Sequence, residues 1–184
     1  MLFVHSHAIS LLEVPNEISL CFNISGCPCK CEGCSEPYLR EDVGDCLTFD
    51  YIKDLLKRYK DYGLTCICFM GGDKDHEDLE ELLILVKAEF PNIKTAFYSG
   101  FDYINVDLIP HLNYYKYGRF ILPEGEPSEW HKKSCGPINF PWSNQKVFKI
   151  VDNKMIDITN EFRQNPLSDL TRYIIKEEDV KNDR

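Results

Sequence analysis

The sequence predicts an α/β fold, a partial (incomplete) parallel β/α barrel. Short apolar stretches typical of buried strands alternate with amphipathic stretches typical of helices, which is the order of a parallel sheet with right-handed crossovers. The expected strands at 18–24, 65–70, 94–98 and 115–122 are too few for a closed barrel, even with one or two more near 146–158. The unusual loops follow the carboxyl ends of these strands, where such sheets bind ligands.

The first part of the chain predicts two strands. Phe3 to Leu12 and Ile18 to Ile24 are apolar, β-rich runs, and the turn signal Val14-Pro15-Asn16-Glu17 separates them. In the second run, large apolar residues at even positions alternate with small or polar residues at odd positions. That period of two indicates a strand, and a loop rich in cysteine follows it directly.

Helix signals lie between the later strands. Thr48 is expected to cap a helix at its N-terminus, and Gly63 is expected to stop that helix. Leucines and valine at helical spacing between Leu79 and Val86 predict a second helix, which Pro91 closes. A shorter helix is expected at 106–112.

Length and composition favour one globular domain. The chain has 184 residues, of which 43% are hydrophobic and 12% aromatic, and this content excludes a disordered protein. We expect a single domain over residues 1–175 and a charged, frayed tail over 176–184. The stretch from Pro123 to Pro141 is punctuated by prolines, and with Trp130, Phe140 and Trp142 it is a candidate docking rim for a protein partner. The alternative is that these aromatic residues fold back and complete the core.

Charge and hydropathy exclude several partners. The formal net charge of −9 is spread along the chain without a basic stripe, so we expect no nucleic acid as partner. No stretch approaches the roughly 18 consecutive apolar residues of a membrane span, and the first residues do not resemble a signal peptide. Nine cysteines without an export signal indicate a cytoplasmic protein whose thiols serve metal or redox chemistry.

Four cysteines crowd the loop after the second expected strand: Cys27, Cys29, Cys31 and Cys34. Cys31-x-x-Cys34 alone is a common knuckle for zinc or iron–sulfur. A zinc module needs a second pair, but the other close pair, Cys66-x-Cys68, lies in an apolar strand with both side chains on one face. We therefore interpret that pair as small core residues.

A different subset of the loop cysteines indicates an iron–sulfur cluster. Cys27, Cys31 and Cys34 form a C-x3-C-x2-C pattern, which supplies three thiolates to a cluster of four irons and leaves one iron without a protein ligand. An open iron suits a site where a substrate binds the metal, as the open position of catalytic zinc does.

The chain resembles the radical S-adenosylmethionine enzymes, and more narrowly the activating protein of anaerobic (class III) ribonucleoside-triphosphate reductase. The resemblance extends from about Glu13 to Lys149. It rests on Ile24-Ser-Gly-Cys-Pro-Cys-Lys-Cys-Glu-Gly-Cys34, Met70-Gly-Gly-Asp73, Phe90-Pro91, Phe97-Tyr-Ser-Gly-Phe101 and Ser143-Asn-Gln-Lys146.

The resemblance implies a partial barrel of the radical S-adenosylmethionine type, one 4Fe-4S cluster on the three cysteines and S-adenosyl-L-methionine as second cofactor. Reductive cleavage would give a 5′-deoxyadenosyl radical, which generates a glycyl radical on the reductase. A flavodoxin or ferredoxin is the implied electron donor. The residues expected to bind S-adenosyl-L-methionine are Gly71, Gly72, Asp73, Ser99 and Gly100, with an ordinary turn as the alternative for Ser99-Gly100.

Two positions depart from the family pattern. Gly33 stands where many members carry an aromatic residue, and Ser35 stands where the activases often carry tyrosine. Adenine stacking must then come from elsewhere, and Phe22 and Tyr38 are the candidates.

Three further cysteine-loop and polar-loop residues allow more than one interpretation. Cys29 lies outside the triad, and we interpret it as facing solvent or closing the loop, with a ligand or redox role as the alternative. Asn144 and Gln145 either bind the cofactor or partner or form a plain polar loop.

Three other functions remain open from the sequence. The protein is alternatively the activase of another glycyl-radical enzyme, or a small-molecule radical enzyme such as a carboxydeazaguanine synthase, which should hold Arg and Lys groups inside the barrel. From a different class, it is a zinc-binding interaction module that uses all four loop thiols.

Overall fold

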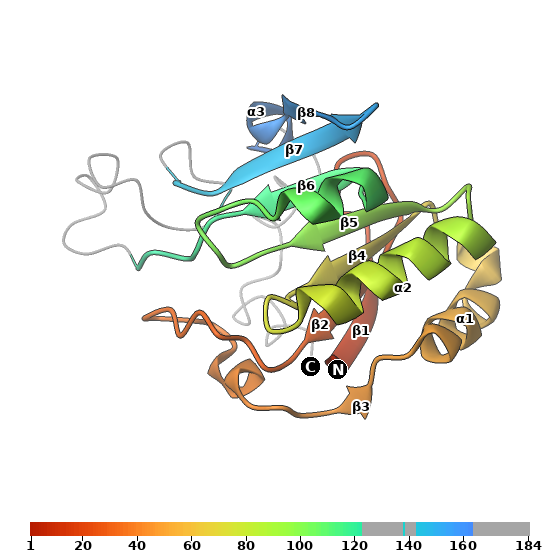
Figure 1. The fold of residues 1–184 in the computed structure, drawn as a ribbon, viewed down its shortest axis with the longest axis horizontal. Helices are drawn as coiled ribbons and strands as arrows, with labels where there is room; N and C mark the ends of the chain where they lie inside the picture. The colour runs from red at the N-terminus through yellow and green to blue at the C-terminus, as the bar shows by residue number, and fades with distance from the viewer. Residues whose placement is uncertain (123–137, 139–142, 164–184) are drawn as a thin grey trace, which may run out of the picture.

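The computed structural model describes residues 1–122, 138 and 143–163. Within these residues the strands form one eight-stranded sheet in the order β3-β1-β2-β4-β5-β6-β7-β8 (Figure 1). The strands are β1 (Phe3–Ser10), β2 (Ser19–Ile24), β3 (Asp45–Cys46), β4 (Cys66–Met70), β5 (Lys94–Tyr98), β6 (Tyr114–Tyr117), β7 (Lys146–Val151) and β8 (Lys154–Asp157). The α-helices are α1 (Phe49–Arg58), α2 (His76–Glu89) and α3 (Thr159–Arg163), and the 3₁₀-helices are η1 (Pro37–Arg40), η2 (Lys60–Tyr62) and η3 (Val106–His111).

The centre of the sheet is parallel. β2, β4, β5 and β6 pair in parallel, and the chain returns between them through α1, α2 and η3. These are the four strands that the sequence predicts as parallel. β1 and β3 on one side, and β7 and β8 on the other, pair antiparallel. The sheet is therefore mixed, and its assignment to a partial barrel stays a prediction.

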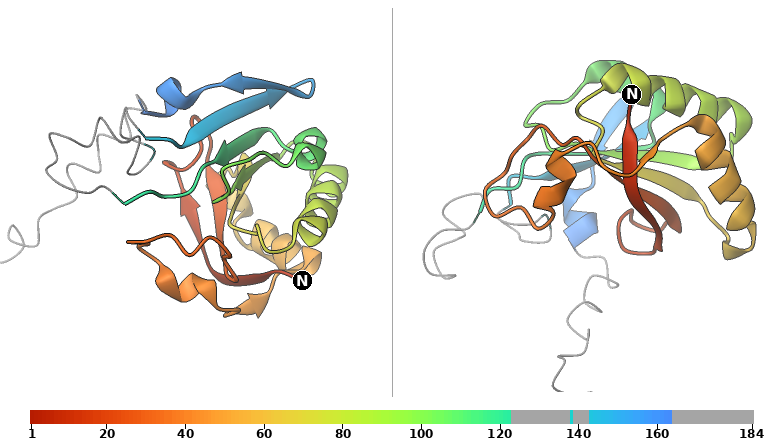
Figure 2. Two further views of the ribbon diagram at one scale, coloured as in Figure 1. Left: turned by 60° about the vertical axis from the view of Figure 1, so that its left-hand side comes forward. Right: turned by 90° about the horizontal axis from the view of Figure 1, so that it is seen from below.

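The two faces of the sheet carry different cores. α1 and α2 lie on the same face, as the views in Figures 1 and 2 agree. The helix-covered face buries Leu20, Phe22 and Ile24 of β2 against leucines of α1 and α2. The opposite face buries a second cluster that includes Cys66, Cys68, Ala96, Tyr98, Tyr114 and Val147. Cys66 and Cys68 are fully buried there, which confirms their interpretation as core residues.

The helix ends follow local rules with small differences. The Thr48 side chain accepts a 3.1 Å hydrogen bond from the Tyr51 amide, as a cap should. α1 ends at Arg58, and the left-handed residue Gly63 follows the short η2 instead of α1 itself. The helix expected at 106–112 is the 3₁₀-helix η3, since Pro110 within it cannot donate an α-helical hydrogen bond.

β6 is shorter than expected, and it ends at Tyr117. Beyond it, the Gly118 amide donates to the carbonyl of Phe101, in the loop after β5, at 2.8 Å. Of the strand expected at 115–122, only residues 115–117 are in β6. The chain that continues beyond Tyr117 lies close to the loop that follows β5.

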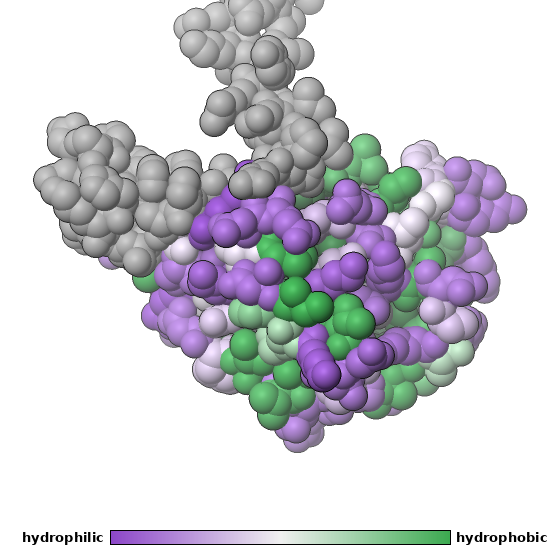
Figure 3. All heavy atoms as spheres, turned by 90° about the horizontal axis from the view of Figure 1, so that it is seen from above, coloured by the Kyte–Doolittle hydropathy of each residue, from purple (hydrophilic) through white to green (hydrophobic). Residues whose placement is uncertain are grey.

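The molecular surface mixes polar and apolar side chains. Figure 3, seen from above the view of Figure 1, shows small groups of apolar side chains among polar ones. Val151 and Ile156, from β7 and β8, are among the exposed apolar residues. No helix among the described residues is long and apolar enough to cross a membrane. The expected docking rim, apart from Ile138, and the expected tail at 176–184 lie outside the described residues.

Candidate functional site

The cysteine loop is anchored where it leaves β2. The Ser25 amide donates to the carbonyl of Phe3 at 2.9 Å, and the Cys27 amide donates to the carbonyl of Leu39 at 2.8 Å. The Ser25 hydroxyl also bonds to both backbone groups of Val43. These hydrogen bonds join the start of the cysteine loop to β1 and to the segment that follows the loop, and Cys27 lies in this anchored part.

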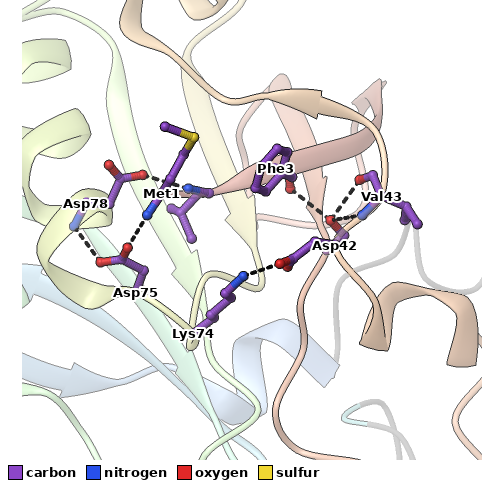
Figure 4. Close-up of polar contacts among 9 residues, drawn as sticks. Met1, Phe3, Asp42, Val43, Lys74, Asp75 and Asp78 are labelled. Atoms are coloured by element: carbon purple, nitrogen blue, oxygen red, sulfur yellow. Dashed lines mark hydrogen bonds and ion pairs between the residues drawn. The ribbon is translucent and has the colours of Figure 1, made fainter.

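A second set of contacts ties this region to the loop after β4. Figure 4 shows the ion pair between Lys74 and Asp42, which joins the segment after Gly71-Gly72 to the segment after the cysteines. The Leu2 amide, at the start of the chain, donates to Asp78 of α2 at 2.8 Å. The Lys74–Asp42 ion pair thus joins the loop after β4 to the segment after the cysteine loop, although the two are far apart in the sequence.

Cys27, Cys31 and Cys34 line a single cavity of about 190 Å³. The ends of β4 and β5 form its opposite wall. The other lining residues are Ile24, Lys30, Ser35, Glu36, Leu39, Arg40, Met70, Gly71, Asp73, Tyr98 and Gly100. The structure thus brings the three predicted cluster ligands to one place, next to the loops that the sequence predicts to bind the second cofactor. We call this the cysteine cavity.

The five predicted cofactor-binding residues divide into two groups. Gly71, Asp73 and Gly100 line the cysteine cavity, whereas Gly72 and Ser99 do not. Gly72 lies over the core, and Ser99 lies behind the cavity, where its hydroxyl donates to Asp73 Oδ1 at 2.5 Å. Ser99 therefore does not line the cysteine cavity, and its hydroxyl helps to position the Asp73 carboxylate.

Two glycines allow a close approach that any side chain would block. Gly71 has a φ of 97°, and a Cβ there would lie 2.9 Å from the carbonyl oxygen of Ile24. A Cβ on Gly100 would lie 2.7 Å from the sulfur of Cys29. Glycine at both positions therefore lets the loops after β4 and β5 approach the cysteine loop.

Cys29 does not face solvent, which corrects part of the expectation. Its side chain is 7% exposed and packs against Gly100. A hydrogen bond from the Cys29 thiol lowers the pKa of Cys27 to about 6, although burial alone would raise it. The same hydrogen bond, together with burial, raises the pKa of Cys29. The pair therefore favours a thiolate on Cys27, the form that binds metal, and a neutral thiol on Cys29.

The two candidates for adenine stacking do not lie in the cavity. Phe22 is fully buried on the helix-covered face, against Phe69, so its expected stacking role is wrong. Tyr38 is exposed, its ring lies tilted against that of His5 with centroids 4.9 Å apart, and it does not line the cysteine cavity. Tyr98 and Met70 line the cavity instead, and both come from the strand ends that precede the predicted loops.

Arg40 is a cavity residue that the sequence did not single out. Its guanidinium donates to the carbonyl of Cys31 at 2.8 Å and therefore braces the middle of the cysteine loop. The sequence signal for it is weak, a short turn that begins at Pro37. Lys30 and Glu36 also line the cavity, and no sequence pattern had indicated either residue.

A second, larger cavity of about 410 Å³ adjoins the first. Cys34 and Ser35 line both, and the remaining lining residues are Gly33, Lys116, Phe120, Ile138 and Gln145. Of the polar loop at 143–146, Gln145 reaches this cavity, and its amide nitrogen donates to the carbonyl of Gly118 at 3.0 Å. The Asn144 amide donates to the carbonyl of Arg119 at 3.1 Å. We call this space the second cavity.

The donor set fits an iron–sulfur cluster, since three cysteines line one cavity. In the described part of the chain, no three His, Cys, Asp or Glu side chains group so that they could hold one metal ion, as a zinc site requires. In a cubane cluster each thiolate binds a different iron, so the three sulfurs need not converge on one point. Three thiols around one cavity, one of them with a lowered pKa, fit that requirement.

These features define an iron–sulfur protein, and the comparison with known families agrees. The sequence profile of the family described as "4Fe-4S single cluster domain" matches residues 18–133, well over half of the chain. The chain belongs to this family. No curated protein and no solved structure matches it.

Proposed function

We propose that this iron–sulfur protein is a radical S-adenosylmethionine activase that generates a glycyl radical on anaerobic ribonucleoside-triphosphate reductase. The observation that carries the proposal is the cysteine cavity. Its walls combine Cys27, Cys31 and Cys34 with Gly71, Asp73 and Gly100 from the loops after two parallel strands. A plain electron carrier has a fourth thiolate in its ligand set and no such adjoining space.

In this proposal Cys27, Cys31 and Cys34 hold the cluster and leave one iron open. When bound and reduced, the cluster would supply the one electron needed to cleave S-adenosylmethionine into methionine and a 5′-deoxyadenosyl radical, and that radical would take a hydrogen atom from a glycine Cα of the partner. A low-potential donor such as flavodoxin or ferredoxin supplies that electron.

The chain's own residues prepare the site. Cys29 keeps its own thiol proton and donates it in a hydrogen bond to the Cys27 sulfur, so Cys27 can release its proton to solvent and bind iron as a thiolate near neutral pH. Asp73 fixes the loop after β5 through Ser99 and the Gly100 amide. Gly71 and Gly100 leave space beside the cysteines for the amino acid end of the cofactor. The partner's glycine loop then covers the site and excludes water.

The test is reconstitution without oxygen. We expect about four irons per chain, a brown colour, and formation of 5′-deoxyadenosine from S-adenosylmethionine with a strong reductant. Addition of the reductase should give the spin-resonance doublet of a glycyl radical. Iron uptake without 5′-deoxyadenosine would leave an iron–sulfur protein and reject the activase, and one tight zinc would favour an interaction module.

A specific observation also favours a second candidate, a small-molecule radical enzyme. Such an enzyme needs a charged group that fixes its substrate in a cavity beside the cluster. Lys116, which lines the second cavity, is a charged group of this kind. The two candidates separate when 5′-deoxyadenosine formation is measured with the reductase and, in parallel, without any protein partner.

A further inference from the structure

We propose that the second cavity binds a carboxylate group of the molecule that donates the hydrogen atom, and that Lys116 is the cationic group that holds it. The inference deepens the proposed function, because it names the chemistry of the second substrate at the same site. It rests on three observations: the state of Lys116, its place beside the cysteine cavity, and the shape and lining of the second cavity.

Lys116 is a partly buried cation with no anionic partner among the described residues, where no ion pair or hydrogen bond involves its ammonium group. Its ammonium group lies over an aromatic ring, with Nζ 4.9 Å from the ring centroid of Tyr98. Burial lowers the pKa of Lys116, and the more distant Glu13 offsets this only in part. A cation in such a place gains free energy when an anion enters.

Lys116 lies next to the cysteine cavity. Lys116 of β6 and Tyr98 of β5 are paired in parallel register, so their side chains share one face of the sheet. Tyr98 lines the cysteine cavity, and Lys116 lines the second cavity. Because Cys34 and Ser35 line both, a group bound at Lys116 is adjacent to the space where the proposed radical forms.

The second cavity has the features of a small-ligand site. Its volume of about 410 Å³ lies within the usual range for ligand sites of about 300–1,000 Å³. Phe120 and Ile138 supply apolar walls, and Gln145 supplies an amide that is already fixed by Gly118. Among the described lining residues Lys116 is the one cation, which matches a monoanion, and a carboxylate is the common biological monoanion.

The test uses the full chain under reducing conditions and two matched pairs of probes. The first pair is N-acetylglycine and its uncharged amide, N-acetylglycinamide, and the second is acetyl-Glu-Gly-amide and acetyl-Gln-Gly-amide. Dissociation constants from ligand-observed nuclear magnetic resonance should be at least about 10-fold lower for an acid than for its neutral partner, as expected for a hydrogen bond to a charged group. Preference for N-acetylglycine identifies a free small acid, and preference for acetyl-Glu-Gly-amide identifies an acidic protein loop.

Variants then assign the effect to Lys116. Lys116→Met should remove the preference for the acids, Lys116→Arg should retain most of it, and Lys149→Met, at an exposed lysine of β7, should leave it unchanged. Equal binding of acid and amide by the unmodified protein overturns the inference without any variant. So does an acid preference that survives Lys116→Met when thermal unfolding shows the variant folded.

The outcome is separable from that of the proposed function. Cleavage of S-adenosylmethionine by the reconstituted protein is measured on the same preparations. Binding of acids that depends on Lys116 without any cleavage supports the carboxylate site and rejects the radical chemistry. Cleavage without a preference for the acids supports the radical chemistry and rejects the carboxylate site.

Discussion

The carboxylate of Asp73 and the backbone amide of Gly100 are joined by a 2.8 Å hydrogen bond, although the two residues are 27 positions apart. The second carboxylate oxygen accepts from the Ser99 hydroxyl at 2.5 Å. Asp73 follows β4, and Gly100 follows β5, so one side chain fixes two neighbouring loops at the carboxyl edge of the parallel strands. Both loops contribute to the cysteine cavity.

Replacement of Asp73 tests this link. Asp73→Asn puts a donor amide where one of the two carboxylate oxygens now accepts, so we expect a loss of about 1–3 kcal/mol in the free energy of unfolding. Ser99→Ala should cost less, because Gly100 still donates to Asp73. Urea unfolding measures both, with Asp61→Asn, an exposed aspartate of η2, as control. Equal stability of Asp73→Asn and the control would contradict the structure.

The contact between Gly100 and Cys29 predicts coupled effects. Gly100→Ala should destabilise the protein by about 1–3 kcal/mol, because its Cβ would overlap the Cys29 sulfur. Cys29→Ala removes that sulfur, so the double variant should be more stable than the sum of the two single effects predicts. A double-mutant cycle from urea unfolding measures the coupling. Strict additivity would show that the two residues are not in contact.

Gly71 tests the close approach of the loop after β4. Gly71→Ala combines a left-handed φ of 97° with a Cβ 2.9 Å from the Ile24 carbonyl oxygen, and we expect it to cost about 2–4 kcal/mol. Gly63→Ala is the matched control, since Gly63 has a φ of 68° and its nearest contact is 3.8 Å away. It should cost about 1 kcal/mol from backbone strain alone. Similar losses at both positions would mean that the Ile24 contact is unimportant.

Glu17 predicts a pH dependence of stability. Burial alone would raise the pKa of Glu17, but hydrogen bonds from Lys94, Tyr114 and Thr65 together lower it from its ordinary value of 4.5. A lowered folded pKa stabilises the protein above pH 4.5, and this contribution is lost as the pH falls through the folded pKa. Glu17→Gln should therefore cost about 1.5–3 kcal/mol at pH 7.

The difference in the free energy of unfolding between wild type and Glu17→Gln should shrink as the pH falls below 4.5. Chemical unfolding at a series of pH values measures it. Glu81→Gln, at an exposed position of α2, is the control and should show no such trend. A difference that grows toward acid pH would have the wrong sign and would reject the assignment.

The loop cysteines predict a pattern of loss and retention. Cys27→Ala, Cys31→Ala and Cys34→Ala should each abolish cleavage of S-adenosylmethionine, because each removes one proposed thiolate ligand. Cys29→Ala should keep cleavage, since the structure places Cys29 against Gly100 and outside the cavity lining. Iron content and 5′-deoxyadenosine are measured on all four variants. Loss with Cys29→Ala alone would reverse the ligand assignment.

The sequence predicted the parallel centre of the sheet and the grouping of the site because both depend on local patterns. The alternation in residues 18–24 indicates a strand, Thr48 marks a helix start, and the cysteine spacing marks a ligand set. The structure has β2 and α1 at these positions and brings the three cysteines to one cavity. A loop that follows a parallel strand reaches the same edge of the sheet as its neighbours, whatever the rest of the fold does.

Other features could not be predicted, because they depend on which face the helices cover. The alternation of Phe22 with Cys21 shows that they point to opposite faces, but not that Phe22 points toward α1 and α2. For the same reason no sequence pattern indicated that Lys116 shares a face with Tyr98. The burial of Cys29 depends on its contact with Gly100, a residue more than 70 positions away in the chain.

The backbone anchoring of the cysteine loop affects how metal uptake relates to folding. In a zinc finger the metal must order the chain that binds it, and the free protein is unfolded. Here the amides of Ser25 and Cys27 and the Ser25 hydroxyl are already bonded to Phe3, Leu39 and Val43 by the polypeptide itself. Folding itself therefore already orders the backbone that carries the cysteines, and metal binding has little further conformational entropy to remove. Insertion and oxidative loss of the cluster can then occur on a chain that keeps its tertiary structure.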